Sequence, residues 1–202
     1  MIHLEKAGGI WTATIDRQDK ANSLTEAMLT ELAEIAEAAQ DARVLILTGA
    51  GRVFSAGADL DAARAGLAIS PAWERLSSAI ATLPGLTIAA LNGTVAGGAM
   101  GMVLACDLRI ASQGTKFFYP VMKLGFLPQP SDPPRLARLI GPSRAKLILM
   151  CGQKIDTDQA LNWGLVDQIT DGDTLMTAAH ALAADTLCAT PEHATGIKRL
   201  IP

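Results

Sequence analysis

Two glycine-rich segments carry the residue types that most clearly suggest chemistry. They are residues 52–60, RVFSAGADL, and residues 92–101, NGTVAGGAMG, and each follows an apolar stretch typical of a buried strand. Small residues let a ligand approach the backbone, and the start of a helix presents N–H groups without partners. Two such N–H groups aimed at one point can stabilise a developing oxyanion. Taken alone, each segment is also explained by tight packing of a strand against a helix.

Other familiar sites have no counterpart in the sequence. No glycine segment ends in Gly-Lys-Ser or Gly-Lys-Thr, no strand leads into a GxGxxG segment, and there is no GxSxG. The three histidines, His3, His180 and His193, are far apart in the sequence and far from any cysteine. We therefore expect no metal site.

The glycine-rich segments belong to a chain in which strand-like and helix-like patterns alternate. Strands are predicted over residues 3–5, 10–15, 43–48, 86–91, 108–111, 116–119 and 165–169. Helices are predicted over residues 24–40, 60–68, 71–83, 98–105, 135–140, 143–151, 157–163 and 174–188, with loops over 49–59 and 128–134. This alternation is typical of an α/β protein with buried sheets.

Composition limits the possible classes of protein. The chain has 202 residues, of which 50% are hydrophobic and 18% charged, so we expect one folded domain and no extensive disorder. A net charge of -3 argues against a nucleic-acid partner. The three cysteines fit no disulfide framework and the N-terminus has no targeting character. Both features favour a cytoplasmic protein.

One uncharged run, residues 76–106, is long enough to raise the alternative of a membrane-spanning helix. The run contains Pro84, Asn92 and five glycines, which would interrupt such a helix. We therefore expect a buried strand, a glycine-rich loop and a buried helix in this region, and no membrane partner.

The two segments and their surroundings resemble the crotonase superfamily, also called the enoyl-CoA hydratase/isomerase family. The resemblance rests on FSAGADL, then IAALNGTVAGGAMG, then ACDLRIAS, and it is extended by DRQDKANSL near the start and DTDQALNWGLVD near the end. It covers residues 2–190. It implies a right-handed spiral of ββα units, assembly as a homotrimer or hexamer, and a coenzyme A thioester as ligand, with no tightly bound cofactor.

The resemblance also assigns roles to individual residues. The two backbone N–H groups of the family's oxyanion hole correspond to those of Ala58 and Gly98. The residues that correspond to coenzyme A contacts are Lys20, Ala21, Ala56 and Leu60.

The sequence departs from this family at both catalytic glutamates of the hydratases. Gly101 and Val121 occupy those two positions, and neither side chain can transfer a proton. Simple two-glutamate hydration is therefore not expected. Asp132 and Tyr119 are the remaining candidates, although Asp132 could be a turn residue before two prolines and Tyr119 could be a packing residue. Gln129 stands near the place where some relatives carry an aspartate.

Two further departures concern binding and length. Asp61 stands where relatives often carry a lysine. A negative charge at this position would weaken the attraction for the coenzyme A phosphates. Residues 1–190 are expected to form the crotonase core and residues 191–202 a short tail, with the family's terminal helices shortened. The expected function is that of an acyl-CoA hydratase/isomerase-family enzyme. A non-catalytic acyl-CoA-binding protein and a CoA-thioester hydrolase are the alternatives.

Overall fold

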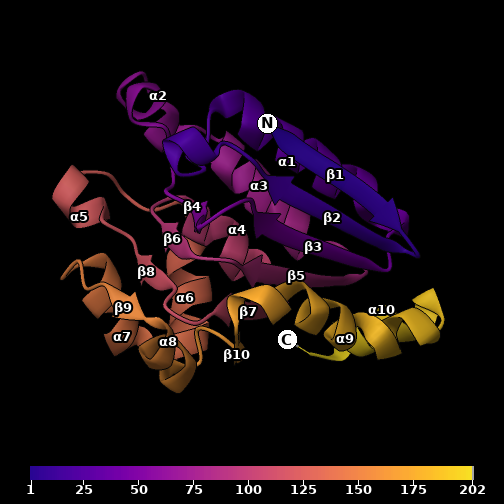
Figure 1. Cartoon of the computed structure of the whole chain (residues 1–202). Coiled ribbons are helices and arrows are strands. Elements are labelled where there is room, and N and C mark those ends of the chain that lie inside the picture. The colour runs from indigo at the N-terminus through magenta and orange to yellow at the C-terminus, as the bar shows by residue number, and fades with distance from the viewer. Residues whose placement is uncertain (202) are drawn as a thin grey trace.

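A computed structural model describes residues 1–201, and its main feature is a six-stranded sheet (Figure 1). The first two strands are antiparallel, and every later neighbour in the sheet is parallel. In spatial order the strands are β1 (Ile2–Ala7), β2 (Ile10–Ile15), β3 (Val44–Gly49), β5 (Leu86–Leu91), β7 (Leu108–Ser112) and β10 (Gln168–Thr170).

A second sheet is built from four short strands, of which three directly follow strands of the first sheet and the fourth, β9, follows helix α7 (Pro142–Leu149). In spatial order its strands are β4 (Val53–Ser55), β6 (Thr94–Ala96), β8 (Lys116–Phe118) and β9 (Ile155–Asp156). Thus β3 is followed by β4, β5 by β6, and β7 by β8, and helices follow each pair. This repeated strand–strand–helix order confirms the expected spiral of ββα units.

Helices cover both faces of the six-stranded sheet. Their bounds are α1 (Glu26–Ala38), α2 (Leu60–Arg64), α3 (Ala72–Ala81), α4 (Ala99–Ala105), α5 (Val121–Leu124), α6 (Asp132–Ile140), α7 (Pro142–Leu149), α8 (Thr157–Trp163), α9 (Leu175–Cys188) and α10 (Pro191–Leu200). Figure 1 shows α9 and α10 on one side of the sheet and α1 and α3 on the other. In β3, Val44 and Ile46 pack in the cluster of α9, whereas Leu45 and Leu47 belong to the larger core. Burial on both faces explains the continuous apolar run of this strand.

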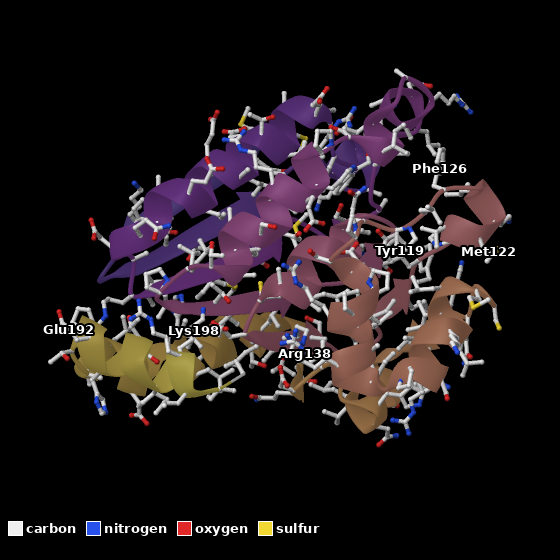
Figure 2. The ribbon with its side chains drawn as sticks, turned by 180° about the vertical axis from the view of Figure 1, so that it is seen from behind. Tyr119, Met122, Phe126, Arg138, Glu192 and Lys198 are labelled. Atoms are coloured by element: carbon white, nitrogen blue, oxygen red, sulfur yellow. The ribbon has the colours of Figure 1, made fainter. Side chains whose placement is uncertain are left out.

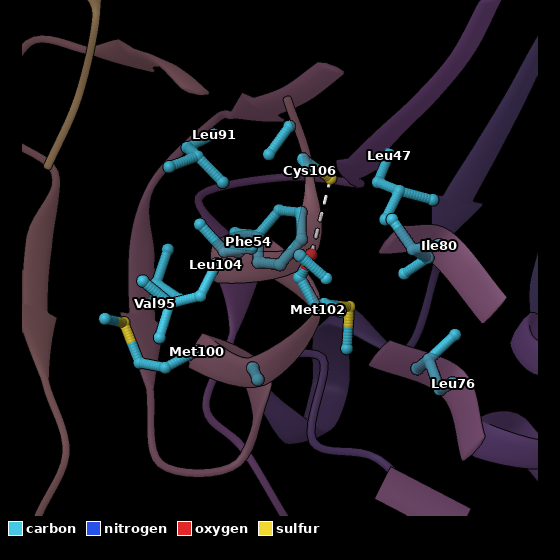
Figure 3. Packing of buried hydrophobic residues seen from close by; sticks show 14 of the residues in the cluster. Leu47, Phe54, Leu76, Ile80, Leu91, Val95, Met100, Met102, Leu104 and Cys106 are labelled. Carbon is cyan, nitrogen blue, oxygen red and sulfur yellow. Dashed lines mark hydrogen bonds between the residues drawn. The ribbon is translucent and has the colours of Figure 1, made fainter. Parts of the chain in front are cut away.

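The uncharged run of residues 76–106 has the predicted organisation. It contains the end of α3, then β5, β6 and α4, and all seven residues of α4 are buried. Phe54 of β4 and Val95 of β6 share the core with Met102 and Cys106 of the following segment, and the Cys106 thiol donates a hydrogen bond to the Met102 carbonyl (Figure 3). Burial raises the pKa of Cys106 to about 12. Within residues 1–201, no helix has both the length and the apolar character needed to cross a membrane.

Several predicted boundaries are wrong. The loop predicted over residues 49–59 contains β4, and β6 lies within the second glycine-rich segment. These strands have only three residues each, too few to show an alternating pattern. The helix predicted over residues 60–68 ends at Arg64, and Gly66 then takes a φ of +109°.

Two later boundaries also differ from the prediction. The strand predicted over residues 165–169 begins only at Gln168, because the N–H groups of Leu165 and Val166 bond back to the Ala160 carbonyl of α8. Helix α6 begins at Asp132 and not at residue 135. Its prolines lie in the first turn, where N–H groups have no acceptor within the helix.

The predicted tail, residues 191–202, contains a helix of ten residues, α10. Thr190 caps its start, and Lys198 fixes its last turn to the sheet. The Lys198 ammonium donates to the Gly85 carbonyl at 2.8 Å and to Asp107 at 2.7 Å (Figure 2 labels Lys198). Residues 191–200 of the predicted tail are therefore helical and attached to the rest of the fold.

Candidate active site

The two glycine-rich segments meet at neighbouring strands. β4 and β6 are parallel partners, and Gly57 and Gly97 follow their ends. A Cβ atom on Gly57 would lie 2.7 Å from the Ala96 carbonyl oxygen and 3.4 Å from the Gly97 Cα. Gly57 also has a φ of +90°, which side chains rarely tolerate. The two backbones can thus approach this closely only with glycine at position 57.

Each segment contains an expected donor, a backbone N–H group that has no acceptor among residues 1–201. Leu24 accepts from the Asp59 N–H and donates to the Gly57 carbonyl, so it pairs with both neighbours of Ala58 and leaves the Ala58 N–H free. Gly98 precedes the first residue of α4, where an N–H has no acceptor within the helix. Among residues 1–201, neither N–H donates to a protein atom. The two expected donors are therefore available on adjoining segments.

Asn22, which was not among the residues predicted for the site, holds the first segment in place. This buried residue donates from Nδ2 to the Ala50 carbonyl at 2.9 Å and to the Val53 carbonyl at 2.6 Å. Its own carbonyl accepts from the Ser55 hydroxyl at 2.7 Å. Its φ of 54° is left-handed, a conformation that asparagine tolerates better than most residues. Its place in the DRQDKANSL segment, shortly before the helix predicted from residue 24, was the signal that could have pointed to it.

Three of the four expected coenzyme A contacts lie on adjacent loops. The Ala56 N–H donates to the Ala21 carbonyl at 3.0 Å, and Lys20 is exposed beside Ala21. Leu60 lies at the start of α2 and is 73% exposed. Asp61, next to Leu60, is exposed and pairs with Arg64 at 3.0 Å.

Asp132 and Tyr119 form a buried pair, with exposed fractions of 1% and 4%. The Tyr119 hydroxyl donates to Oδ2 of Asp132 at 2.8 Å, whereas Oδ1 has no hydrogen-bond partner in the described part of the chain. The alternatives, in which Asp132 is only a turn residue and Tyr119 is only a packing residue, do not account for this hydrogen bond. Figure 2 shows Tyr119 set inward of Met122, which lies on α5, and of Phe126, which follows that helix.

Burial changes the acidity of both groups in this pair. It raises the pKa of Asp132 to about 6, against a lowering effect of the Tyr119 hydrogen bond and the Arg135 charge, while Glu74 raises the pKa further. Burial, together with the Asp132 charge, also raises the pKa of Tyr119 well above its usual range. The pair thus combines a phenol that stays protonated with a carboxyl group that titrates near neutrality.

The Asp132 carboxyl group occupies the space beside Gly101. A Cβ atom on Gly101 would lie 2.8 Å from Oδ1 and 3.1 Å from Oδ2 of Asp132. The Gly101 N–H bonds to the Gly98 carbonyl at 3.0 Å, so the two glycines are separated by about one helical turn. The structure therefore brings Asp132 to the same end of α4 as the Gly98 N–H.

Val121 and Gln129, the other two positions considered from the sequence, add no acidic side chain beside Gly101 and Asp132. Val121 is a buried residue at the start of α5, and the amide of Gln129 donates to the Ala68 carbonyl at 3.3 Å. Within residues 1–201, no group of three or more His, Cys, Asp or Glu side chains could hold a metal ion.

Solved structures share this fold closely. An enoyl-CoA hydratase/isomerase from Pseudoalteromonas atlantica T6c superposes with a TM-score of 0.91 at 27% identity, covering 99% of this chain and 82% of that one. Pseudomonas aeruginosa DspI gives a TM-score of 0.90 at 33% identity, covering 99% of this chain and 85% of that one. The fold is thus that of the crotonase class of α/β proteins.

Sequence comparison gives the family. The enoyl-CoA hydratase/isomerase family model matches residues 5–201, and the chain belongs to that family. A 1,2-epoxyphenylacetyl-CoA isomerase from Escherichia coli K12 is 34% identical, covering 91% of this chain and 74% of that relative. A short-chain-enoyl-CoA hydratase from Clostridium acetobutylicum is 35% identical, covering 90% and 73%.

Proposed function

We propose that this protein is an enzyme that binds an acyl-CoA thioester and stabilises its enolate with the N–H groups of Ala58 and Gly98. The observation that carries this proposal is the close approach of two segments that each present a free N–H. Family membership supports the ligand class, because the relatives described above are named for acyl-CoA substrates.

The proposed chemistry follows from the position of the two donors. The thioester carbonyl oxygen accepts both hydrogen bonds, which draws electron density from the carbonyl carbon and acidifies the adjacent C–H bond. When that proton leaves, the negative charge collects on the same oxygen. Fixed donors favour this charged state more than the neutral substrate, so they lower the barrier to enolate formation.

The proposed coenzyme A contacts are Lys20, Ala21, Ala56 and Leu60. The bond between the Ala56 N–H and the Ala21 carbonyl holds two of them together, and the exposed Lys20 ammonium can face a phosphate. No tightly bound cofactor is part of this proposal. Assembly as a homotrimer or hexamer and a cytoplasmic location also belong to it, and the three free thiols are consistent with a reducing compartment.

Two-glutamate hydration is not part of the proposal, because Gly101 and Val121 cannot transfer protons. The same two residues favour a second candidate, a non-catalytic acyl-CoA-binding protein. The unpartnered oxygen of buried Asp132 favours an enzyme over that alternative, because it leaves one carboxyl oxygen available.

A panel of acyl-CoA thioesters tests the function. Calorimetry measures binding, absorbance reports loss or formation of a conjugated double bond, and free thiol reports hydrolysis. We expect binding of thioesters with a change in absorbance and no thiol release. Absence of binding by every thioester would overturn the ligand class, and hydration of a 2-enoyl-CoA at ordinary hydratase rates would overturn the argument from the missing glutamates.

A further inference from the structure

We infer that Asp132 is the acid–base residue of this site, that it reaches from α6 into the space that a side chain at position 101 of α4 would fill, and that Tyr119 positions it. This inference rests on the proposed function, because it names the proton carrier for the enolate held by Ala58 and Gly98.

The Asp132 carboxyl group and a side chain at position 101 would occupy the same space. Both carboxyl oxygens of Asp132 lie within 3.1 Å of the Cβ position of Gly101. A Cβ atom is essentially never found 2.8 Å from an oxygen that is not bonded to it, so a side chain at 101 would displace the Asp132 carboxyl group from its present position. The carboxyl group lost from α4 is thus replaced, in the same place, by one from another element.

The Asp132 carboxyl group is also held in a fixed position. Ser131 precedes Asp132 and donates from both its N–H and its hydroxyl to the carboxylate of Glu74 on α3. Pro133 and Pro134 stiffen the residues that follow, and the Tyr119 hydroxyl holds Oδ2. A proton carrier works best when its approach to the reacting carbon is fixed in advance.

The other oxygen of the Asp132 carboxyl group, Oδ1, is not held by Tyr119. Oδ1 is buried and has no hydrogen-bond partner within the described residues, an arrangement that is unfavourable for a purely structural carboxyl group. The charged and titratable groups that influence this carboxyl group are Arg135, Glu74 and Tyr119. With its pKa near 6, Asp132 is mostly ionised at neutral pH and can still hold a proton during turnover.

A single carboxyl group defines the class of reaction. Oδ1 takes a proton from C2 of the thioester, and the electron pair of that C–H bond moves into the enolate. The protonated Asp132 then returns the proton to C4 of a 3-enoyl thioester, which yields the 2-enoyl isomer. Atoms and electrons balance without water, oxidant or reductant. The substrate class is therefore an unsaturated acyl-CoA whose double bond moves by proton transfer.

Deuterium exchange tests this inference. The full-length protein is incubated with a 3-enoyl-CoA in D2O, deuterium in the thioester is measured by mass spectrometry, and the 2-enoyl product is followed by absorbance. We expect exchange and isomerisation by the wild type. We expect the Asp132→Asn variant, which still accepts from Tyr119, to bind a saturated acyl-CoA normally by calorimetry and to lose at least 100-fold in exchange rate.

Two further variants separate chemistry from structure. Asp158→Asn, an exposed change on α8, should leave exchange unchanged. Tyr119→Phe removes a hydrogen bond that lowers the pKa of Asp132, so the pH midpoint of exchange should move upward while some activity remains. A merely structural role for Tyr119 would change melting temperature without moving this midpoint.

The outcomes distinguish the two proposals. Exchange at the wild-type rate by folded Asp132→Asn would overturn the role of Asp132 and leave acyl-CoA binding intact. Binding without any exchange by the wild type would also overturn it and favour the non-catalytic alternative. If the wild type binds no thioester at all, the proposed function itself fails.

Discussion

At the scale of single residues, Gly101 and Asp132 depend on each other sterically. The carboxyl group fills the space beside the glycine, and the glycine leaves room for the carboxyl group. The sequence identified both residues, together with Tyr119. It could not show that they meet, because contacts between residues 101, 119 and 132 depend on the packing of α4 against α6.

Replacing Gly101 by alanine should destabilise the protein. The new Cβ would lie 2.8 Å from Oδ1 of Asp132. The site is closely packed, so we expect the free energy of unfolding in urea to fall by about 1–3 kcal/mol. Adding Asp132→Ala should restore part of this loss. Gly196→Ala, where a Cβ meets open space in α10, is the matched control, and an equal loss there would contradict the explanation.

The buried carboxyl group should also make stability depend on pH. Its pKa rises from 3.8 in the unfolded chain to about 6 in the folded protein, so the folded state binds more protons between these values. Stability should therefore fall as pH rises from 4 through 6, by up to about 3 kcal/mol. Urea unfolding of the wild type and of Asp132→Asn, at pH 4.5 and at pH 8, measures the difference. Equal pH dependence in both proteins would contradict this assignment.

The turn from β4 into the following loop is the critical feature at the scale of elements. The sequence predicted the strands before both glycine-rich segments and the helix after the second. It missed β4 and β6, because three residues carry no period and their partners lie on distant parts of the chain. It also missed the role of Asn22, whose bonds to residues 50 and 53 depend on that pairing.

Gly57→Ala should be more damaging than an ordinary glycine substitution. The added Cβ would combine an unfavourable φ of +90° with a contact of 2.7 Å to the Ala96 carbonyl oxygen. Gly66→Ala is the matched control, since its φ is +109° and a Cβ there meets nothing. We expect about 1–2 kcal/mol of destabilisation for Gly66→Ala from backbone strain alone, and a larger loss for Gly57→Ala, by urea unfolding. Equal losses would show that the contact with β6 is unimportant.

At the scale of the whole molecule, α9 packs on one face of the six-stranded sheet and α10 lies beside it, attached through Lys198. The resemblance to a known superfamily was sufficient to predict the spiral of ββα units. Helix α10 was not predicted, because residues 191–200 are partly exposed and their polar pattern resembles that of a tail. Its attachment depends on Lys198, whose partners at residues 85 and 107 are remote in sequence.

Lys198→Met should loosen α10 without unfolding the core. The substitution removes two hydrogen bonds but keeps much of the aliphatic stem, and the ion pair is partly exposed. We therefore expect only about 1 kcal/mol of lost stability. Hydrogen exchange should become faster across α10 and stay unchanged in β5 away from Gly85. The exposed Arg199→Met on the same helix is the control, and equal acceleration in both variants would contradict the anchoring role.

The central claim is that two backbone N–H groups stabilise an enolate, and removing one of them tests it most directly. Ala58→Pro deletes a donor that has no acceptor among residues 1–201, whereas Ala58→Gly keeps it. Both variants are first shown to be folded. We expect the rate of deuterium exchange at C2 of a 3-enoyl-CoA to fall about 100- to 1,000-fold in Ala58→Pro. We expect the rate in Ala58→Gly to stay close to that of the wild type. Exchange by Ala58→Pro at the wild-type rate would contradict this claim.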